Sequence, residues 1–423
     1  MIYNFKKKDS KVYNLIKKEN LRQKEGLILI PSENYASLEV LAAMATPLNN
    51  KYSEGYPEKR YYSGNEFIDE IEKIAIERAK KIFKAEHANV QPHSGSQANE
   101  AAYLAILKPK DSVLSLDLAA GGHLSHGAKF NFSGKFYNFF HYGVDKKTEK
   151  INFREVEEKA LKYKPKLIIA STTSYSRTLD FKKFRKIADK VGAYLLADIA
   201  HIAGLVVAGL HPHPFPFADI VTTTTQKTLR GPRGGLILCK KSDRFDKKSL
   251  AEKIDLAVFP GTQGGPFEHV IAAKAICFLE AAKPGFRKYQ EQIILNSKSM
   301  VEVFKKEGFR VISGGTDNHL FVIDISSTGM ASVFIQNELE KINIFVNRNK
   351  IPFDEKPAFN PSGIRIGTPA ITTRGLKEKE AKEIAYLICQ FLNDINSLEL
   401  KVKIRKRVKE ICKKFTVYDD FRW

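Results

Sequence analysis

Strand-favouring apolar segments alternate with helix-favouring segments over a long stretch of this chain, from about residue 36 to residue 241. Residues 181–191 form one of the helical segments. The strand-like segments are residues 112–118, 166–170, 193–198, 219–224 and 235–239. Such alternation is typical of a mostly parallel sheet that is covered by helices on both faces. The sequence therefore predicts an α/β fold for this part of the chain.

The segments outside this stretch predict further parts of the molecule. Residues 8–22 have the pattern of an N-terminal helical arm, and residues 267–282 that of a connecting helix. A smaller α+β region should follow, with a strand at 320–325 and helices at 331–341, 376–393 and 402–414. A chain of 423 residues with 43% hydrophobic residues can bury the cores of two domains. We expect an arm (1–35), a large domain (36–282) and a small C-terminal domain (283–423).

One lysine, Lys227, follows the fourth strand-like segment within the run TTTTQKTLRGPRGG, residues 222–235. The four threonines are β-branched and favour an extended chain, and the glycines and proline after them favour a turn. A lysine held at the end of a strand among small hydroxyl side chains is placed to be desolvated and to attack a carbonyl group as a free amine. The alternative is a solvated loop lysine in a lysine-rich chain.

A carboxylate, Asp198, ends the strand-like segment 193–198. Ligands of open α/β sheets bind outside the carboxyl ends of the strands, so Asp198 and Lys227 are expected to face one crevice. A carboxylate there suits the pyridinium nitrogen of pyridoxal phosphate (PLP), because it keeps the proton on the ring and strengthens the ring as an electron sink. A helix N-cap is an equally open interpretation of Asp198.

A small-residue loop, Ser94, Gly95 and Ser96, precedes the helix-like residues 100–107. Backbone N–H groups, two hydroxyl groups and a helix N-terminus together form an anion site. The loop is neither GxGxxG nor a Walker sequence, so neither a dinucleotide nor a nucleoside triphosphate is indicated. The glycine-rich residues 259–266 could also approach a phosphate through bare backbone.

These motifs resemble those of the serine hydroxymethyltransferases, PLP-dependent enzymes of the aspartate-aminotransferase fold (fold type I). Strings this long, in family order over nearly the whole chain, are far more specific than any single motif. Besides TTTTQKTLRGPRGG they are LIPSEN (29–34), NKYSEGYPEKRYYSGNE (50–66), NVQPHSGSQAN (89–99), GGHLSHG (121–127), LLADIAHIAGLVVAGL (195–210), FPGTQGGP (259–266) and SGIRIGTPAITTRG (362–375). The resemblance implies a mostly parallel central sheet with helices on both faces and a smaller C-terminal α+β domain.

The resemblance implies cofactor roles position by position. Lys227 would bind PLP covalently as a Schiff base, Asp198 would pair with the ring nitrogen, and His123 would stack on the ring. His201 and Thr173 would lie near the oxygen substituents of the ring. The residues that would hold the phosphate are Ser94, Gly95 and Ser96 and, from a partner subunit, Gly264 and Gly265.

Substrate roles follow from the same resemblance. Arg365, helped by Ser32, would bind the amino-acid carboxylate through its planar fork. Glu54 would transfer a proton near the substrate hydroxyl group, Tyr52 would be supplied across a dimer interface, and Tyr62 would be a further active-site tyrosine. The residues at the positions that bind the folate are Leu118, Gly122, Leu124 and Asn349.

Each of these residues also has a structural interpretation. Arg233 and Arg365 could be surface arginines, and His123 and His201 could be core histidines with satisfied ring nitrogens. The tyrosines near residue 52 could be ordinary interface aromatics. The resemblance favours the functional interpretation for all of them except the two folate-site leucines, which are expected to be apolar and buried in either case.

The chain departs from the family at a few positions. The family has histidine directly before the cofactor lysine, whereas this chain has Gln226. Glutamine donates and accepts hydrogen bonds but does not titrate near neutral pH, so the change concerns rate and reaction specificity more than cofactor binding. Ala120, Pro31 and Asn65 replace a frequent histidine, alanine and cysteine, and we interpret them as changes in the surroundings of the site.

The chain is strongly basic, with 69 Lys and Arg against 48 Asp and Glu and a net charge of +21. The densest basic run, residues 401–414, also places apolar residues at helical spacing, so it predicts an amphipathic helix with a basic outer face. Nucleic-acid binding would be one interpretation. We favour a solvated surface, or a field that attracts polyanionic folates, because the charge is spread along the chain and no RNA-binding motif occurs.

Several other classes are not indicated. No run of about 18 apolar residues occurs, so no membrane span is predicted. Residues 1–8 have no apolar segment after the lysines, so no secretory signal is predicted. The paired histidines at 123 and 126 and at 211 and 213 lack further ligands nearby, so no metal site is expected. The four cysteines are far apart and lack the spacing of metal ligands, so we interpret them as buried thiols in a reducing cytoplasm and expect a cytoplasmic location: Cys239, Cys277, Cys389 and Cys412.

The expected protein is therefore a PLP-dependent enzyme that transfers the hydroxymethyl carbon of serine to tetrahydrofolate and releases glycine, as a homodimer or tetramer with shared active sites. One alternative is a folate-independent aldolase of threonine or other β-hydroxy amino acids. The other is a non-catalytic protein that binds nucleic acid. The folate-site positions argue against the first alternative, and the intact pair of Lys227 and Asp198 argues against the second.

Overall fold

The computed structural model describes residues 8–419, so the prediction that residues 1–8 contain no secretory signal falls almost entirely outside that range. The chain divides into two compact units. The large unit is Glu39–Glu291, and the other unit combines Met1–Leu38 with Gln292–Trp423. The N-terminal segment is thus grouped with the C-terminal residues.

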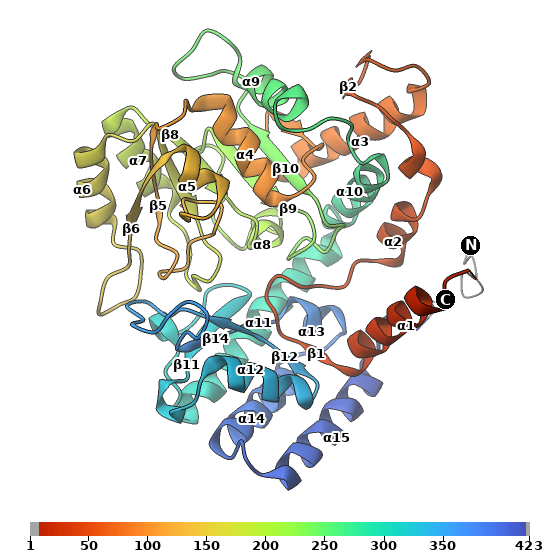
Figure 1. Cartoon of the computed structure of the whole chain (residues 1–423), viewed down its shortest axis with the longest axis vertical. Helices are drawn as coiled ribbons and strands as arrows, with labels where there is room; N and C mark the ends of the chain where they lie inside the picture. The colour runs from red at the N-terminus through yellow and green to blue at the C-terminus, as the bar shows by residue number, and fades with distance from the viewer. Residues whose placement is uncertain (1–7, 420–423) are drawn as a thin grey trace. The chain divides into compact units, whose positions relative to one another are not determined.

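The large unit is built on a seven-stranded sheet (Figure 1). In spatial order its strands are β4 (His87–Asn89), β10 (Gly235–Cys239), β9 (Ile220–Thr224), β8 (Tyr194–Asp198), β7 (Leu167–Ser171), β5 (Ser112–Leu116) and β6 (Asn138–Tyr142). All paired neighbours are parallel except β10, which runs antiparallel to both β9 and β4. The expected α/β architecture is confirmed, and β4 and β6 are strands that the sequence pattern missed.

The central strands are buried on both faces, as their near-continuous apolar sequences require. Every residue of β7, β8, β9 and β10 is buried. On one face, Leu167 and Ile169 of β7 pack with Ala98 and Ala101 of α4 (Gly95–Ile106). Successive strand residues point to opposite faces, so the residues between them pack on the other side of the sheet.

Helices α6 (Phe153–Tyr163) and α7 (Phe181–Val191) contact the sheet through β5, β6, β7 and β8. The ring of Phe184 lies 5.7 Å from that of Tyr142 on β6. Helix α7 begins where the carboxylate of Asp180 accepts a hydrogen bond from the N–H of Lys183, and it ends at Gly192. Gly192 has φ of +67°, a left-handed conformation that glycine adopts without strain.

A second group of helices lies beside β4. Helix α3 (Glu66–Phe83) packs along α10 (Glu268–Ala281), and the short hairpin of β2 (Gly55–Tyr56) and β3 (Lys59–Arg60) precedes α3. The remaining helices of this unit are α2 (Leu38–Met44), α5 (Phe132–Phe136), α8 (Ala203–Val207), α9 (Leu250–Leu256) and the short η2 (Pro47–Asn50) and η3 (Ala257–Thr262). Helix α11 (Pro284–Lys306) contains the boundary between the two units.

The other unit has an antiparallel sheet in the order β11 (Leu320–Asp324), β14 (Gly363–Gly367) and β13 (Asn347–Asn349). Strand β1 (Leu27–Ile28) pairs in parallel with β12 (Ile344–Phe345), which explains why the N-terminal segment belongs here. The helices are α1 (Ser10–Glu25), α12 (Ser332–Lys341), α13 (Pro369–Thr373), α14 (Glu378–Asn393) and α15 (Leu398–Lys414), with short turns η4 (Ile312–Gly314) and η5 (Ser326–Thr328).

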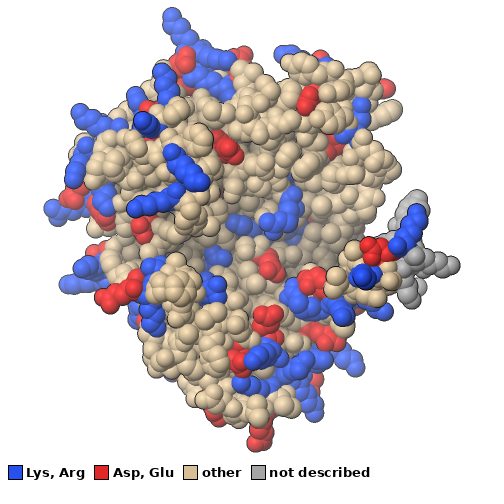
Figure 2. Space-filling model, in the orientation of Figure 1, with Lys and Arg blue, Asp and Glu red and all other residues tan. Residues whose placement is uncertain are grey.

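Helix α15 confirms the predicted amphipathic helix at the basic C-terminal run. Its buried residues are Ile404, Val408, Ile411 and Cys412. Its lysines and arginines are mostly exposed. On the face of the molecule in Figure 2, basic side chains are scattered and mixed with acidic ones and form no single stripe. Within residues 8–419, no helix is long and apolar enough to cross a bilayer.

Candidate active site

A pocket of about 190 Å³ lies in the large unit beyond the carboxyl ends of β7, β8 and β9, next to the start of α4. This is the position at which open α/β sheets bind ligands. The structure brings eight of the predicted residues to its wall: Ser94, Gly95, Ser96, His123, Thr173, Asp198, His201 and Lys227.

Lys227 is fixed by the turn that follows β9. Thr224 pairs with Gly235 across the antiparallel strands, and the N–H of Thr225 donates to the carbonyl of Gly234 at 3.2 Å. The N–H of Gly231 then returns to the carbonyl of Thr225 at 2.8 Å, which closes the loop. Lys227 is only 9% exposed, so the alternative of a solvated loop lysine is wrong.

Asp198 is the last residue of β8 and is buried in the pocket wall. Its Oδ2 accepts hydrogen bonds from Nε2 of His126 and from Nδ2 of Asn99, each at 3.0 Å, and its Oδ1 accepts one from the N–H of Ala200, also at 3.0 Å. Helix α8 begins later and has Ile202 at its N-cap position, so the helix-cap interpretation of Asp198 is wrong.

These contacts decide the charge of Asp198. Burial by itself would raise the pKa of the carboxyl group, but the hydrogen bond and charge of His126, the charge of His123 and the hydrogen bond from Asn99 outweigh burial. The pKa of Asp198 therefore lies below its ordinary value. The pocket holds a carboxylate that is ionised at neutral pH, and such a group can stabilise a proton on a facing ring nitrogen.

Asn99 connects this carboxylate to a second pocket residue. Its Nδ2 also donates to Oγ of Ser125 at 2.9 Å, and Oγ of Ser125 lies 2.7 Å from Nδ1 of His123. The N–H of Ser125 donates to the same Nδ1 at 3.2 Å. The amide is itself oriented, because Oγ1 of Thr222 donates to its Oδ1 at 2.6 Å. One side chain on α4 thus orients both Asp198 and the imidazole of His123.

His126 is likewise held on both ring nitrogens. Its Nδ1 lies 2.6 Å from the hydroxyl of Tyr103, and its Nε2 also lies 3.1 Å from Oγ of Ser171. No role was predicted from the sequence for Asn99 or His126. Both stand inside motifs that were recognised, SGSQAN and GGHLSHG, but their function depends on an acidic partner that is distant in sequence.

The loop that was predicted to bind a phosphate lies at the start of α4. Ser94 is the N-cap of α4, and its Oγ accepts from the N–H of Gln97 at 3.3 Å. The first N–H groups of a helix have no partner within the helix, so those of Gly95 and Ser96 are suited to an anion. A Cβ on Gly95 would lie 2.5 Å from Cγ2 of Thr224, which explains the glycine at this position.

A buried lysine binds the backbone on either side of this pocket wall, at residues 90–92 and at Gly235. Lys274 of α10 is 1% exposed, and its Nζ donates to the carbonyls of Val90, Pro92 and Gly235 at 2.6, 3.1 and 2.7 Å. Burial lowers the pKa of Lys274 to about 7. Three carbonyl acceptors match the three hydrogens of an ammonium group, so the contacts favour the charged form. No sequence pattern distinguishes this lysine from the others.

The departure from the family, Gln226, lines the same pocket. Its Oε1 is buried and has no hydrogen-bond partner within the described part of the chain. A buried amide oxygen without a partner is costly, and such atoms occur where a ligand or water completes the site. Two of the other departures lie outside the pocket lining: Nδ2 of Asn65 donates to the carbonyl of Tyr62 at 2.7 Å, and Pro31 packs against Gly367.

A second group of predicted residues lies together but does not line this pocket. The rings of Tyr52 and Tyr62 are 5.0 Å apart, and the hydroxyl of Tyr52 lies 3.5 Å from Oε1 of Glu54. A Cβ on Gly264 would lie 3.0 Å from that carboxylate oxygen, and one on Gly265 would lie 3.7 Å from the ring of Tyr52. The two tyrosines are 56% and 46% exposed.

The predicted folate positions require one correction. Leu118 and Leu124 were expected to be buried, but they are 40% and 43% exposed. They belong to the loop after β5, where Gly122 is held by a hydrogen bond of 2.9 Å to the carbonyl of Asp117. Loops that follow strands run over the surface, and here they leave apolar side chains uncovered.

Three predicted substrate residues, Ser32, Asn349 and Arg365, belong to the other unit. Arg365 of β14 is buried, so the interpretation as a surface arginine is wrong, and its Nε donates to Oδ1 of Asn347 at 3.2 Å. Burial lowers the pKa of Arg365 to about 10, so its guanidinium stays charged at neutral pH. Arg233, the other arginine considered, is exposed at the wall of the pocket in the large unit.

Comparison with known proteins agrees with these observations. A model of the serine hydroxymethyltransferase family matches residues 5–388. The serine hydroxymethyltransferase of Coprothermobacter proteolyticus is 54% identical over 410 residues, which cover 97% of this chain and 97% of that protein. A match of this extent includes both units and every predicted site residue. The chain therefore belongs to the serine hydroxymethyltransferase family, whose members are PLP-dependent transferases of fold type I.

Proposed function

We propose that this protein transfers the hydroxymethyl carbon of serine to tetrahydrofolate, reversibly, and so forms glycine and 5,10-methylenetetrahydrofolate. One observation carries the proposal in a chain of this family. Lys227 and Asp198 line a single pocket, and Asp198 is buried and kept ionised by His126 and Asn99. This is the pair that a pyridinium cofactor requires.

The pocket residues fit PLP at both of its ends. Asp198 would hold the proton on the ring nitrogen, and the N-terminus of α4 with Ser94, Gly95 and Ser96 would bind the phosphate. Lys227 would hold the cofactor covalently. When bound, PLP supplies an electron sink for the negative charge that remains when the Cα–Cβ bond of serine breaks.

The remaining pocket residues orient and hold protons. Nε2 of His126 keeps Asp198 ionised, which in turn favours the protonated ring nitrogen. His123, oriented through Ser125, would lie against the ring, and His201 and Thr173 would meet its oxygen substituents. Each of these groups is buried or backed by a hydrogen bond, so little reorganisation is needed when charge develops.

Arg365 would bind the carboxylate of serine, with Ser32 as a second donor. Its buried, permanently charged fork suits a planar carboxylate. The folate would contact Gly122 and Asn349 together with the partly exposed Leu118 and Leu124, which offer apolar surface to a flat ring system. Glu54 would transfer the proton at the hydroxyl oxygen of serine.

The active form would be a homodimer with shared sites. Tyr52, Glu54, Gly264 and Gly265 form one cluster that does not line the chain's own pocket, and both Tyr52 and the neighbouring Tyr61 are more than half exposed, at 56% and 77%. Exposed aromatics beside functional groups are typical of a surface that a partner covers. A second subunit would bring this cluster to the phosphate and the substrate.

We also propose a cytoplasmic location. The four cysteines are buried and free, which suits a reducing compartment.

The decisive experiment measures glycine formation from serine by the purified protein with and without tetrahydrofolate. Folate-dependent formation of glycine and methylenetetrahydrofolate supports the proposal. Rapid cleavage of threonine with no effect of tetrahydrofolate on serine would instead identify a folate-independent aldolase. A protein that binds PLP but cleaves neither amino acid would refute both activities.

A further inference from the structure

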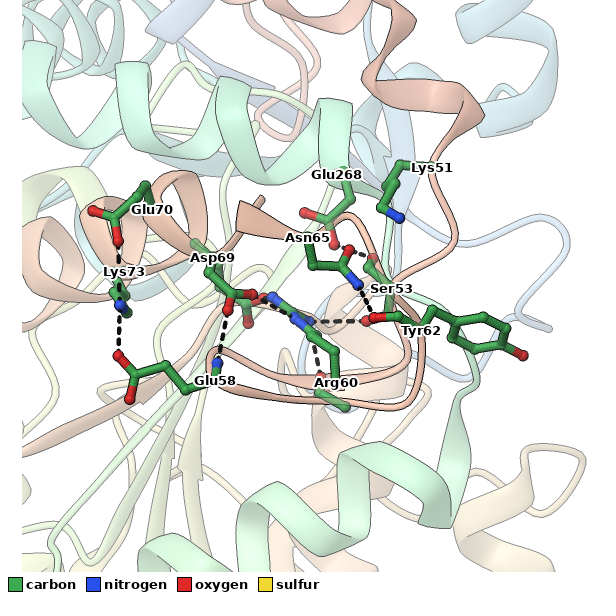
Figure 3. Close-up of polar contacts among 12 residues, drawn as sticks. Lys51, Ser53, Glu58, Arg60, Tyr62, Asn65, Asp69, Glu70, Lys73 and Glu268 are labelled. Atoms are coloured by element: carbon green, nitrogen blue, oxygen red, sulfur yellow. Dashed lines mark hydrogen bonds and ion pairs between the residues drawn. The ribbon is translucent and has the colours of Figure 1, made fainter. Parts of the chain in front are cut away.

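The side chain of Arg60 is buried and binds four acceptors, two backbone carbonyls and two carboxylates. It belongs to β3, and only 4% of the side chain is exposed. Nη1 donates to the carbonyls of Ser53 and Gly55 at 2.9 and 3.0 Å, as Figure 3 shows in part. Nε and Nη2 bind Asp69 at 2.8 Å and Glu72 at 2.6 Å. All three guanidinium nitrogens are therefore engaged.

The two carbonyls that Arg60 binds stand on either side of one residue, Glu54. The chain turns immediately after it, because Gly55 has φ of +101° and a Cβ there would lie 2.2 Å from the carbonyl of Lys59. The carbonyl of Glu54 itself accepts from the N–H of Tyr61 at 3.0 Å. The backbone that carries the Glu54 carboxylate is thus held at three successive carbonyls.

Two carboxylates of α3 keep the guanidinium in place. Asp69 and Glu72 are one helical turn apart, so both face the β2–β3 hairpin. Asp69 accepts a further hydrogen bond from the N–H of Glu58 at 2.7 Å, and Glu72 accepts one from Nε2 of Gln91 at 2.8 Å. The same amide of Gln91 donates to the carbonyl of Gly55 at 2.9 Å, so the helix and the hairpin are joined twice.

We propose that Arg60 is a positioning residue that fixes the Glu54 carboxylate in its productive place by holding the carbonyl groups of the residues before and after it, Ser53 and Gly55. This inference rests on the proposed function, because it takes Glu54 as the proton-transfer group. Arg60 itself is not among the residues predicted to form the site. Arg60 would touch neither serine, folate nor cofactor.

An arginine is required for this role on geometric grounds. The guanidinium offers five N–H donors in a rigid plane, and Arg60 uses them on two carbonyls and two carboxylates. A lysine keeps the positive charge but has three donors on a single nitrogen and cannot span the same four acceptors. Arg60→Lys therefore separates loss of geometry from loss of charge.

The test compares Arg60→Lys with a matched control, Arg185→Lys, in the full-length enzyme loaded with PLP. Arg185 is also a buried arginine of the large unit, and it binds Asp219 at 2.8 Å, Asp189 at 2.9 Å and the carbonyl of Ala193 at 3.0 Å. Both variants lose a similar network, so similar losses of thermal stability are expected. Only Arg60→Lys should lower kcat for the folate-dependent reaction, by about tenfold or more, with cofactor affinity and the KM for serine nearly unchanged.

A double variant tests whether Arg60 acts on kcat through Glu54. If Arg60 acts through Glu54, adding Arg60→Lys to Glu54→Gln should lower kcat no further than Glu54→Gln alone. If the two substitutions instead lower kcat independently, so that their effects multiply in the double variant, Arg60 has a general structural role and the proposal is overturned. An unchanged kcat in Arg60→Lys would also overturn it. Should that variant fail to fold, Asp69→Asn gives a milder test, because it removes one anchor of the guanidinium and should give a smaller loss of kcat by the same criteria.

A second readout separates this inference from the proposed function. The amide of Tyr61, which donates to the carbonyl of Glu54, should exchange with solvent faster in Arg60→Lys than in the wild-type protein or in Arg185→Lys. Unchanged exchange would overturn the positioning role even if the enzyme is active. A wild-type protein without transferase activity would instead refute the proposed function, while amide exchange would still show whether Arg60 holds this segment.

Discussion

Nε2 of His126 lies 3.0 Å from Oδ2 of Asp198, and both side chains are buried. The contact joins the loop after β5 to the end of β8 and fixes the charge of the carboxylate that lines the pocket. The contribution of this contact to cofactor binding can be measured by substitution, because the chain contains another histidine–aspartate contact elsewhere, which is partly exposed. Nε2 of His87 lies 2.9 Å from Asp255 in a part of the large unit that does not line this pocket.

We expect His126→Leu to weaken PLP binding by about 10- to 100-fold, because a hydrogen bond to a charged group contributes about 1.5–3 kcal/mol. His87→Leu should leave PLP affinity unchanged. Affinity is measured by spectrophotometric titration of the apoprotein. Equal losses in the two variants would mean that His126 acts only on stability.

We expect reduction with borohydride to fix PLP on the peptide that contains Lys227. Lys274 is an internal comparison, since it is also buried and lies beside the loop that carries Lys227. Its amine, however, donates hydrogen bonds to three carbonyls. Mass spectrometry of the digested protein locates the label. A label on Lys274, or on neither peptide, would contradict the assignment of Lys227.

Gln226→His is expected to change the rate or the reaction specificity by up to about tenfold, since one side-chain hydrogen bond contributes about 0.5–1.5 kcal/mol. PLP affinity should stay the same, because Asp198, Lys227 and the phosphate loop are untouched. Rates with serine plus tetrahydrofolate and with threonine are compared in both proteins. If only the histidine variant is active, the natural chain has lost this chemistry.

Shared active sites predict complementation between two inactive variants. In a mixture of Lys227→Ala and Tyr52→Phe subunits, half of the dimers are hybrids by random pairing, and each hybrid has one complete site. About a quarter of the wild-type sites should therefore be recovered after subunit exchange. Native mass spectrometry confirms the exchange. No recovery in confirmed hybrids would mean that each pocket uses its own Tyr52.

Glu268 predicts a pH dependence of stability. It accepts a hydrogen bond from Oγ of Ser53, its Oε2 is buried without a partner among residues 8–419, and burial raises its pKa to about 7. The charges of Glu72 and Asp69 add to this rise, while the hydrogen bond from Ser53 and the charge of Arg60 oppose it. The folded protein therefore binds a proton that the unfolded chain releases at an ordinary glutamate pKa of about 4.3.

The stabilisation from that proton is complete below about pH 4.3 and is lost as pH rises through about 7. Glu268→Gln stays neutral and still accepts from Ser53, so the variant should exceed the wild type in stability at pH 8 but not at pH 4.5. Urea unfolding at the two pH values gives the difference, with Glu77→Gln on the exposed side of α3 as control. A constant difference would place the pKa of Glu268 outside this range.

The sequence by itself determined the α/β architecture and the chemistry around Lys227. Both depend on local information: the alternation of apolar segments, and motifs such as TTTTQKTLRGPRGG in which turn residues and the reactive group are neighbours in the chain. The direction of β10 was not predictable, since a short apolar segment has the same pattern in a parallel or an antiparallel strand. Likewise, the apolar character of Leu118 and Leu124 did not reveal that both are partly exposed.

The tertiary structure alone decided which polar groups support the reactive ones. His126 and Asp198 are 72 residues apart, and Asn99 and Asp198 are 99 apart. Arg60 binds carbonyls close to it in sequence, but as a positioning residue it also needs the ion pair with the buried Glu72 of α3. A side chain takes its role from the partner that folding brings within about 3 Å, and burial then sets the strength of that contact. Neither the identity of the partner nor the burial of the contact can be read from the order of the residues.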